Sequence, residues 1–358
     1  MSFRSFKKQR VARFFFAAAV VVAGLVEPVQ VQAEDQTALR YGPGVISITV
    51  EDDRQDRPLS GDLWYPTSTP EVFSRADKSK VWQMAPADPD GRPAEGRFPL
   101  LVISHGMYGN THNQAWLASE LSRRGYMVAL INHPGTSTFL RDPDQARQMW
   151  DRPVDLSRLI TFLLKDKATS TRIDPDRIYA AGHSLGGYTV MVVAGATFDP
   201  ARQQTNCSGD NQPASCKAFA GWSVAETAAD KQLMSVSRKD SRIRKVISLD
   251  LGGTPLLSTE SLQAVDIPVL VLGAERADMV NQAIESRALA ASLPANMVHH
   301  VELEDAGHFD FMGVCKPEAL DLLSEEEPGD EIVCVKGTVE REAQHKRILA
   351  EILNFLKP

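Results

Sequence analysis

The sequence lacks an excess of positive charge. It contains 39 Lys and Arg residues against 46 Asp and Glu residues, a net charge of −7 at pH 7. Residues 1–33 hold five basic residues and one acidic residue, so the chain without them would carry −11. Nucleic acids and anionic lipid headgroups are bound chiefly through Lys and Arg. We therefore expect neither nucleic acid nor an anionic membrane surface as a partner.

The N-terminal apolar run is too short to cross a membrane. Phe14–Val26 holds 13 residues, whereas a spanning helix needs about 20. Five basic residues precede it (Arg4, Lys7, Lys8, Arg10 and Arg13), none of them in an Arg-Arg pair. Val31 and Ala33 occupy the −3 and −1 positions of a cleavage site, and no cysteine lies nearby. This pattern predicts a Sec-type signal peptide over 1–33, cleaved after Ala33, and a periplasmic or secreted protein without a stable membrane anchor.

Cysteine is scarce, and no CxxC pair occurs. The four cysteines, Cys207, Cys216, Cys315 and Cys334, all lie in polar, loop-like sequence in the second half of the chain. A zinc site is disfavoured because the close Cys spacing is missing and no histidine lies near the first two cysteines. An even number of cysteines in an exported chain indicates disulfides. Short loop closure favours Cys207–Cys216 and Cys315–Cys334 over the two other pairings.

Apolar runs and amphipathic stretches alternate along the rest of the chain. Strands are expected at 45–50, 61–65, 98–103, 126–131, 177–181, 245–250, 267–272 and 298–301, and helices at 112–124, 154–165, 281–292 and 340–356, besides one directly after Gly187. The first two strands are expected to form an antiparallel pair. The later alternation predicts an α/β fold with a mostly parallel central sheet flanked by helices. We expect a single domain over residues 34–358.

One segment, 197–240, interrupts this alternation. It is polar, contains two of the cysteines and Trp222, and shows no strong apolar period. It lies between the helix after Gly187 and the next strand, where a cap over a site at the sheet edge is expected. Two interpretations stay open, namely a small lid tied by Cys207–Cys216 and a surface excursion away from the site. A second polar segment, the acidic stretch 316–337, is expected to be a loop.

The phrase Gly182-His183-Ser184-Leu185-Gly186-Gly187 carries the strongest chemical signal. It follows a predicted strand and precedes a predicted helix, and it matches the pattern GxSxG. Glycines two residues before and after the serine allow a strained turn that lifts the hydroxyl above the sheet edge. A serine hydroxyl is a weak nucleophile that needs a neighbouring base to take its proton. Ser184 is therefore the predicted nucleophile.

His308 is the predicted base, because it follows the last strand in an Asp-Ala-Gly-His loop. The acid that orients its imidazole should lie between the serine and the histidine in the chain. Asp250 ends the strand after the 197–240 segment, and Asp278 lies in the loop after the following strand, with Glu275 a weaker alternative. Asp250 is favoured, and Asp278 stays open as the alternative acid.

Two backbone N–H groups are expected to stabilise the tetrahedral oxyanion. One belongs to Leu185, directly after the nucleophile, and the other to Met107, in the loop after the 98–103 strand. Gly106, which precedes Met107, leaves the backbone open at that point.

Five phrases of the chain together resemble one branch of the α/β hydrolases. They are Leu63-Trp64-Tyr65-Pro66, Ser104-His105-Gly106, Arg152-Pro153-Val154-Asp155, Gly182-His183-Ser184-Leu185-Gly186-Gly187 and Gly307-His308-Phe309-Asp310-Phe311. The branch comprises platelet-activating-factor acetylhydrolase-like proteins and bacterial predicted dienelactone hydrolases. The resemblance, over about residues 45–312, implies the α/β-hydrolase fold and ester hydrolysis through an acyl-serine without metal or cofactor. It also supports Asp250, because the acetylhydrolases have their acid in a phrase similar to Leu249-Asp250.

The sequence thus predicts an exported serine esterase acting on short-acyl or otherwise accessible esters, small or polymeric. Dienelactone hydrolases proper use a cysteine nucleophile, so lactone opening of that kind is not carried over to Ser184. Two alternatives stay open: a non-catalytic binding protein with this fold, and an amidase or peptidase that uses the same triad.

Overall fold

Eight of the strands in the described part of the chain form one twisted sheet. The computed structural model describes residues 38–52, 57–70, 79–89, 91–209, 212–335 and 337–357. The sheet contains β1 (Gly42–Val50), β2 (Leu59–Thr67), β3 (Phe98–Ser104), β4 (Met127–Asn132), β7 (Ile173–His183), β8 (Ile243–Leu249), β9 (Val269–Ala274) and β10 (Val298–Leu303). Their order is β1-β2-β4-β3-β7-β8-β9-β10. The pairs β1–β2 and β2–β4 are antiparallel and all others parallel, which confirms the predicted α/β-hydrolase fold.

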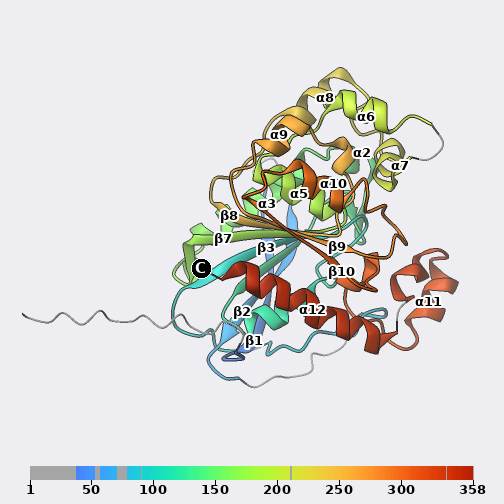
Figure 1. Cartoon of the computed structure of the whole chain (residues 1–358). Helices are drawn as coiled ribbons and strands as arrows, with labels where there is room; N and C mark the ends of the chain where they lie inside the picture. Colours follow the sequence, from blue (N-terminus) through green and yellow to red (C-terminus); the bar gives the residue numbers. More distant parts are fainter. Residues whose placement is uncertain are drawn as a thin grey trace, which may run out of the picture. The chain divides into compact units, whose positions relative to one another are not determined.

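Helices cover both faces of the sheet (Figure 1). The α-helices are α1 (Ala115–Ser122), α2 (Pro143–Arg147), α3 (Asp151–Lys165), α4 (Lys167–Ser170), α5 (Leu185–Ala194), α6 (Pro200–Asn206), α7 (Ala214–Gly221), α8 (Ala228–Ser235), α9 (Thr259–Gln263), α10 (Ser286–Ser292), α11 (Ala319–Glu326) and α12 (Thr338–Leu356). Short 3₁₀ helices are η1 (Thr254–Leu256), η2 (His308–Phe311) and η3 (Asp330–Cys334), and a small hairpin joins β5 (Thr136–Ser137) to β6 (Leu140–Arg141).

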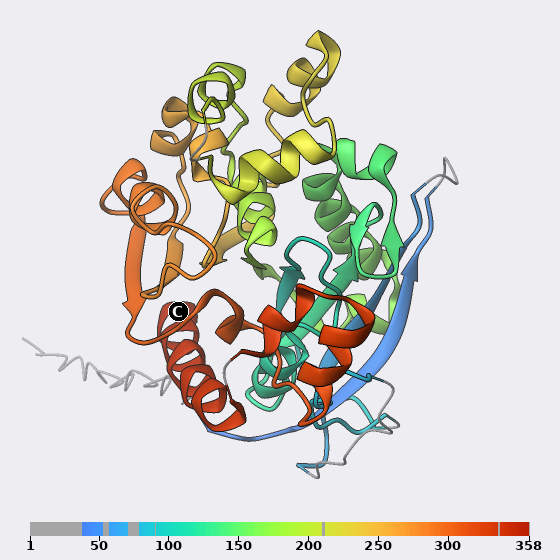
Figure 2. The same cartoon turned by 90° about the vertical axis from the view of Figure 1, so that its right-hand side faces the viewer.

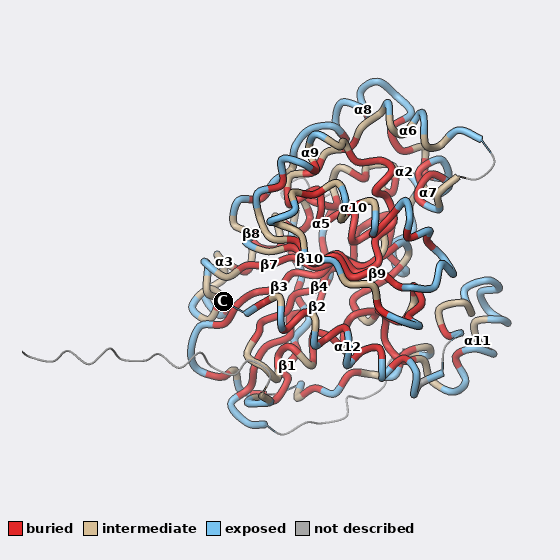
Figure 3. Tube along the Cα trace, viewed as in Figure 1, coloured by how far each residue is buried: buried red, intermediate tan, exposed pale blue. Residues whose placement is uncertain are grey.

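Strict alternation along the central strands divides the core into two clusters. In β7, Ile178 and Ala180 belong to the cluster that contains α3, α5 and α10, whereas Tyr179 and Ala181 belong to the cluster that contains α1 and α12. This follows from strand geometry, because successive side chains point to opposite faces. Both faces are covered, so the central strands are apolar over their paired middle parts, and Figure 3 shows these parts as a buried layer. Only the beginnings of β7 and β8 carry exposed or partly exposed charged residues.

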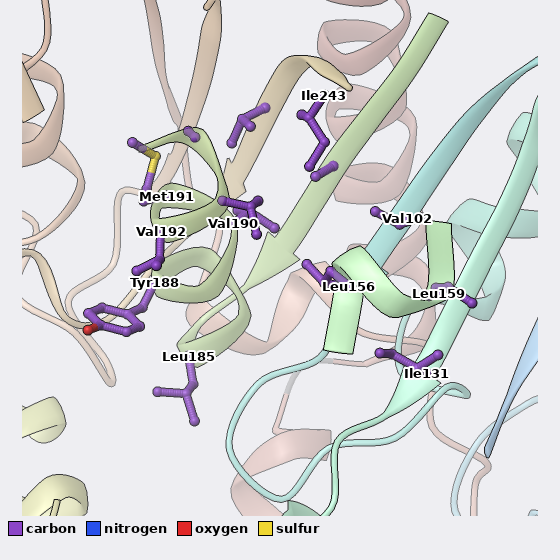
Figure 4. Close-up of a cluster of buried hydrophobic side chains, with 14 of the residues drawn as sticks. Val102, Ile131, Leu156, Leu159, Leu185, Tyr188, Val190, Met191, Val192 and Ile243 are labelled. Carbon is purple, nitrogen blue, oxygen red and sulfur yellow. The ribbon is translucent and has the colours of Figure 1, made fainter. Parts of the chain in front are cut away.

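Figure 4 shows part of the first cluster at close range. Leu156 and Leu159 of α3 lie against Val102 and Ile131 of the sheet. All four side chains are almost completely buried, and each such aliphatic side chain contributes about 1.5–3 kcal/mol when it leaves water.

The chain changes its winding direction at β3. This strand lies between β4 and β7. The strand that follows it in the chain, β4, is therefore added on one side of β3, and β7 is added on the other side. The helix after β3, α1, packs on one face of the sheet, and the helix after β7, α5, packs on the opposite face. The loops that follow the two strands therefore diverge, and such a switch point is where α/β sheets bind ligands. Ser104 at the end of β3 pairs with Gly182 of β7, so both loops start at the same level.

Several predicted boundaries needed correction. The acidic stretch 316–337 is not a plain loop, because α11 and η3 form within it. Its apolar residues Ala319, Leu322 and Leu323 share one helical face and are partly or fully buried. The helix expected over 281–292 begins only at Ser286. Segment 197–240, for which no helix bounds were predicted, contains three short helices, α6, α7 and α8.

Both locally paired disulfides are present. Cys207 is bonded to Cys216 and Cys315 to Cys334, with Cα–Cα separations of 5.3 and 5.7 Å. The predicted signal peptide, residues 1–33, lies outside the described residues. Among the helices that the structure does describe, none is both long and apolar enough to cross a membrane.

Candidate active site

The serine of the GxSxG phrase occupies a sharp turn between a strand and a helix. β7 ends at His183 and α5 begins at Leu185, so Ser184 is the only residue between them. Its φ of 55° and ψ of −119° are strained for a residue with a side chain, at a cost of about 1–3 kcal/mol. The neighbouring glycines are required by close packing. A β-carbon at Gly182 would collide with the Gly186 carbonyl oxygen, and one at Gly186 with the Ser104 carbonyl oxygen.

The imidazole of His308 is fixed by a buried carboxylate. Its Nδ1 lies 2.6 Å from Oδ2 of Asp250, and both side chains are buried. Asp250 follows β8 directly, with a positive φ of 44°. Since Nδ1 is engaged with Asp250, Nε2 is the nitrogen of His308 that is left to exchange a proton with a substrate or a serine.

Three donors satisfy the Asp250 carboxylate. Oδ2 faces His308, while Oδ1 accepts hydrogen bonds from the backbone N–H of Ala274 at 2.8 Å and from Nε2 of Gln282 at 2.6 Å. A buried carboxylate without such partners would cost several kcal/mol. The ionised form of Asp250 is thereby solvated by the protein.

The alternative acid, Asp278, contacts the same histidine at a different atom. Its Oδ1 accepts the backbone N–H of His308 at 3.0 Å, and its Oδ2 lies 3.2 Å from the guanidinium of Arg276. Glu275 accepts the backbone N–H of Asp305 at 2.8 Å. Of the three candidate acids, the geometry brings only Asp250 to the imidazole ring.

His183 supports the loop that carries His308. Its Nε2 donates a hydrogen bond to the carbonyl oxygen of His308 at 2.9 Å, and the two rings lie 4.7 Å apart. Burial, with a further contribution from the neighbouring His308, lowers the pKa of His183 well below its ordinary value. A neutral His183 adds no positive charge beside the imidazole of His308.

The two expected oxyanion donors lie beside the serine. In the described part of the chain, the backbone N–H groups of Met107 and Leu185 donate to no protein acceptor. For Leu185 this follows from its position at the first turn of α5, where N–H groups lack intrahelical partners. Gly106 approaches the nucleophile so closely that a β-carbon there would lie 3.1 Å from Cβ of Ser184.

The Ser184 hydroxyl itself forms no hydrogen bond with any described residue. Ser184 and His308 nevertheless line the same cavity, together with Met107 and Leu185. Hydrogen bonds between a nucleophile and its base are often long in ligand-free enzymes and tighten when the substrate binds. The cavity therefore collects the predicted nucleophile, base and oxyanion donors in one place.

The cavity has a volume of about 530 Å³ and walls from distant parts of the chain. Beyond the predicted site residues it is lined by Trp82, Tyr108, Phe139, Arg141, Ala214, Ser215, Ala218, Met279, Val280, Leu323, Asp330, Ile332 and Val333, among others. Figure 2 looks onto the orange-red segment around α11, with the yellow helices α7 and α8 above it. Both disulfide-bonded segments thus contribute residues to the cavity wall.

A family model described as "Alpha/beta hydrolase family" matches residues 100–318 of the chain. The chain belongs to this family. The match runs from Leu100 within β3 past β10, and it includes the predicted nucleophile, base and acid and the loop that carries Met107.

Individual relatives of this hydrolase-family chain are distant. It is 25% identical over 216 residues to Cutinase est2 of Thermobifida alba, an overlap of 59% of this chain and 53% of the cutinase. It is 28% identical over 127 residues to Bis(hydroxyethyl) terephthalate hydrolase of Streptomyces coelicolor, covering 36% of this chain and 30% of that protein. The chain therefore matches about half the length of the cutinase and less of the second relative.

Among solved structures, the chain is similar to a ferulic acid esterase from Streptomyces cinnamoneus. The TM-score is 0.57 at 19% sequence identity, over 89% of this chain and 90% of that one. At this identity the likeness shows the fold.

Two residues around the site in this hydrolase-family chain, Gln282 and Trp222, were assigned no role from the sequence. Gln282 binds Asp250 from the turn before α10. Trp222, from segment 197–240, donates its Nε1–H to the hydroxyl of Tyr108 at 2.8 Å and thereby joins that segment to the Met107 loop. Whether the segment moves as a lid stays a prediction. Within the described ranges, no group of three or more His, Cys, Asp and Glu side chains is arranged to hold a metal ion.

Proposed function

We propose that the protein is an exported serine hydrolase that cleaves carboxylic esters through an acyl-serine intermediate. One observation supports the proposal above all others. Ser184 and His308 line a single cavity, and Nδ1 of His308 is bound by the buried Asp250 carboxylate. A serine, a histidine and a carboxylate in that connectivity form the nucleophile, base and orienting acid of acyl transfer.

In the proposed reaction, Oγ of Ser184 attacks the ester carbonyl carbon while Nε2 of His308 takes the hydroxyl proton. The carbonyl π-electron pair moves to the oxygen, which the N–H groups of Met107 and Leu185 stabilise. The Asp250 carboxylate offsets the positive charge that His308 acquires. The tetrahedral intermediate then expels the alcohol, which leaves with the proton from His308, and the acyl group stays on Ser184.

Water completes the cycle by the same steps in the second half-reaction. It attacks the acyl carbon and gives a proton to His308, and a second oxyanion forms between the same two N–H groups. Collapse of this intermediate breaks the bond to Ser184 Oγ, which recovers the proton. The net reaction converts one ester and one water into one acid and one alcohol.

We propose esters with apolar or aromatic groups as the substrate class, including ester groups within polymers. The cavity size, about 530 Å³, suits a small organic ester. Three large apolar side chains that line the cavity are strongly exposed, namely Met107 at 48%, Phe139 at 64% and Met279 at 39%. An apolar rim of this kind suits a substrate that continues beyond the cavity. The names of the cutinase and terephthalate-ester relatives support the same class.

Two finer predictions are part of the proposal. Membership of the platelet-activating-factor acetylhydrolase-like branch is supported by the five phrases of the sequence. Export is supported by the N-terminal pattern and by the two disulfides, which persist in oxidising compartments. N-terminal sequencing of protein recovered outside the cytoplasm should begin at Glu34, and full-length protein retained inside the cell would contradict export.

A series of p-nitrophenyl esters, from acetate to long acyl chains, tests the activity. The wild type should hydrolyse members of the series, and Ser184→Ala should lower kcat by about 10⁴-fold or more. Ser208→Ala, which removes an exposed hydroxyl at the end of α6, is the matched control and should keep wild-type activity. A kcat of Ser184→Ala close to that of the wild type would contradict the mechanism.

Two further measurements separate the alternatives. A serine-directed fluorophosphonate should label wild type and not Ser184→Ala, whereas a folded wild type that resists labelling would favour a binding protein. Matched ester and amide substrates with the same acyl group should show faster ester cleavage, and the opposite ranking would favour an amidase or peptidase.

A further inference from the structure

The phrase Arg152-Pro153-Val154-Asp155 begins α3 and has no part in the triad, yet its charged groups are completely buried. Arg152 is 1% exposed and its guanidinium makes four hydrogen bonds. It donates to the hydroxyls of Thr189 at 3.0 Å, Thr136 at 2.5 Å and Ser104 at 3.1 Å, and to the carbonyl oxygen of His105 at 2.5 Å. The last two acceptors belong to the end of β3 and the start of the Met107 loop.

The carboxylate of the same phrase, Asp155, is connected to the end of β3 through the side chain of His133. Arg57 binds Asp155 through two hydrogen bonds of 2.9 and 2.8 Å. Oδ2 of Asp155 also lies 2.9 Å from Nδ1 of His133, whose Nε2 lies 2.9 Å from the hydroxyl of Ser104. Burial, and then the charges of Arg152 and Arg57, lower the pKa of His133 well below its ordinary value. A neutral His133 donates from Nδ1 to Asp155 and accepts at Nε2 from Ser104.

This network fixes the tautomer of His105. Nε2 of His105 accepts the backbone N–H of His133 at 3.0 Å, so that nitrogen carries no proton. Burial, followed by the charge of Arg152, lowers the pKa of His105 well below its ordinary value. The ring is therefore neutral with its proton on Nδ1, which donates to the carbonyl oxygen of Gly106 at 2.7 Å.

The Gly106 carbonyl belongs to the same peptide unit as the Met107 N–H. In a trans peptide the C=O and N–H bonds point in opposite directions, so fixing one fixes the other. His105 holds the carbonyl from one side, and the backbone N–H of Gly109 donates to the same oxygen at 3.2 Å. The Met107 N–H accordingly points away from the His105 ring and has no acceptor among the described residues.

We propose that His105, held by the buried network of Arg152 and His133, is the positioning residue that orients the Met107 N–H toward the oxyanion formed at Ser184. The inference rests on the proposed function and deepens it. His105 is absent from the residues that line the cavity, so its role is one of positioning. It acts through the Gly106–Met107 peptide, because loss of its Nδ1 donor leaves the Gly106 carbonyl held only by the longer hydrogen bond from Gly109.

A pair of polar substitutions at one position tests the proposal. His105→Asn places an amide N–H near the Nδ1 position and can still donate to Gly106. His105→Gln reaches the Nε2 position instead, so it can accept from His133 but lacks the donor for Gly106. Removing one oxyanion donor costs about 10²–10³-fold in kcat. We expect His105→Gln to lose about 10²-fold in kcat with KM nearly unchanged, and His105→Asn to recover at least tenfold of that loss.

Two controls separate orientation from stability. Thermal unfolding of both variants is compared with that of Leu163→Ala, which removes a fully buried side chain at the far end of α3. Leu163→Ala should lower the Tm while keeping kcat. Equal kcat values for His105→Asn and His105→Gln, or a loss in kcat that follows Tm across all three variants, would overturn the proposal.

The rate of fluorophosphonate labelling makes the test independent of the ester chosen. The phosphonyl oxygen requires the same N–H donors, so His105→Gln should be labelled about 10²-fold more slowly than wild type and His105→Asn less so. If wild type is labelled and the two variants react at the same rate, the positioning role fails while the proposed function stands. If wild type is not labelled, both fail.

Discussion

Replacing Asp250 by Asn is the sharpest test of the triad, because the structure dictates how the new amide must turn. Two donors, the Ala274 N–H and the Gln282 amide, point at the position of Oδ1. The amide oxygen of Asn will occupy that position, since an NH₂ group there would face two donors. The NH₂ group then faces Nδ1 of His308, which can no longer be protonated. The imidazole is forced into the tautomer with its proton on Nε2, and it cannot accept the proton of Ser184.

The expected cost is about 10⁴-fold in kcat, the size of the effect known for the wrong histidine tautomer in a Ser-His-Asp triad. Asp278→Asn is the matched control, because it removes a carboxylate that contacts the same histidine at its backbone. An amide oxygen at that site still accepts the His308 N–H. Only the ion pair with Arg276 is lost, and a partly exposed pair of this kind contributes at most about 1 kcal/mol. Asp278→Asn should therefore stay within about fivefold of wild type.

Both variants are assayed with the best p-nitrophenyl ester at saturating concentration, alongside thermal unfolding. If Asp250→Asn keeps turnover within tenfold of wild type while Asp278→Asn loses it, the assignment of the acid is wrong. A loss in both variants would show that the backbone contact of Asp278 matters as much as the ring contact.

Three other changes have defined outcomes. Replacing Cys315 and Cys334 together by Ser should lower the unfolding free energy by up to about 3 kcal/mol in urea titrations, with no loss expected if the bond is absent. Burial raises the pKa of Glu285 to about 7, so its stability contribution is favourable at low pH and is lost as pH rises from about 4.5 through 7. Glu285→Gln should therefore be more stable than wild type at pH 8, by up to about 3 kcal/mol, and equal to it near pH 4; a pH-independent difference contradicts this. Gly186→Ala should destabilise the folded protein by about 1–3 kcal/mol or more, because the new β-carbon would collide with the Ser104 carbonyl oxygen. Gly221→Ala is the control, because a β-carbon there has no atom within 4 Å and should not destabilise the protein. Equal Tm values for the two variants would refute the packing argument.

The sheet could be predicted because the local sequence of each strand shows a recognisable apolar pattern. β3 and the part of β7 from Ile178 onward are buried on both faces, so their sequences are mainly apolar and bounded by turn residues. The predicted start of the helix at residue 281 was wrong because polar contacts determine the local structure there. The helix expected from residue 281 starts late because Gln282 lies in a turn that directs its side chain to Asp250, and Glu285 accepts the N–H groups of Gly253 and Thr254. Those partners are about 30 residues away in the chain, and no periodicity reveals them.

The supporting residues of the site were missed for the same reason. His105 was named only as part of the phrase Ser104-His105-Gly106, with no role assigned to its side chain. Its function depends on the backbone N–H of His133 and the guanidinium of Arg152, which lie 28 and 47 residues further along the chain. The phrase that contains Arg152 was recognised by resemblance, but a resemblance gives no contact. Pairing of β3 with β4 places His133 beside His105, and packing of α3 on the sheet brings Arg152 to the same point.

The choice between Asp250 and Asp278 shows most clearly where sequence reasoning stops. The two aspartates follow β8 and β9, which are neighbours in the sheet, so their side chains emerge at the same edge. Both bind His308, one at ring nitrogen Nδ1 and the other at the backbone N–H. Chain order and spacing therefore favoured each of them for a sound reason. What separates them chemically is the atom contacted: only a carboxylate on Nδ1 can hold the tautomer and offset the charge of an imidazolium, whereas one on the backbone N–H anchors the loop. In the proposed mechanism, two carboxylates thus act on one histidine for different purposes, and only the loss of Asp250 should lower kcat strongly.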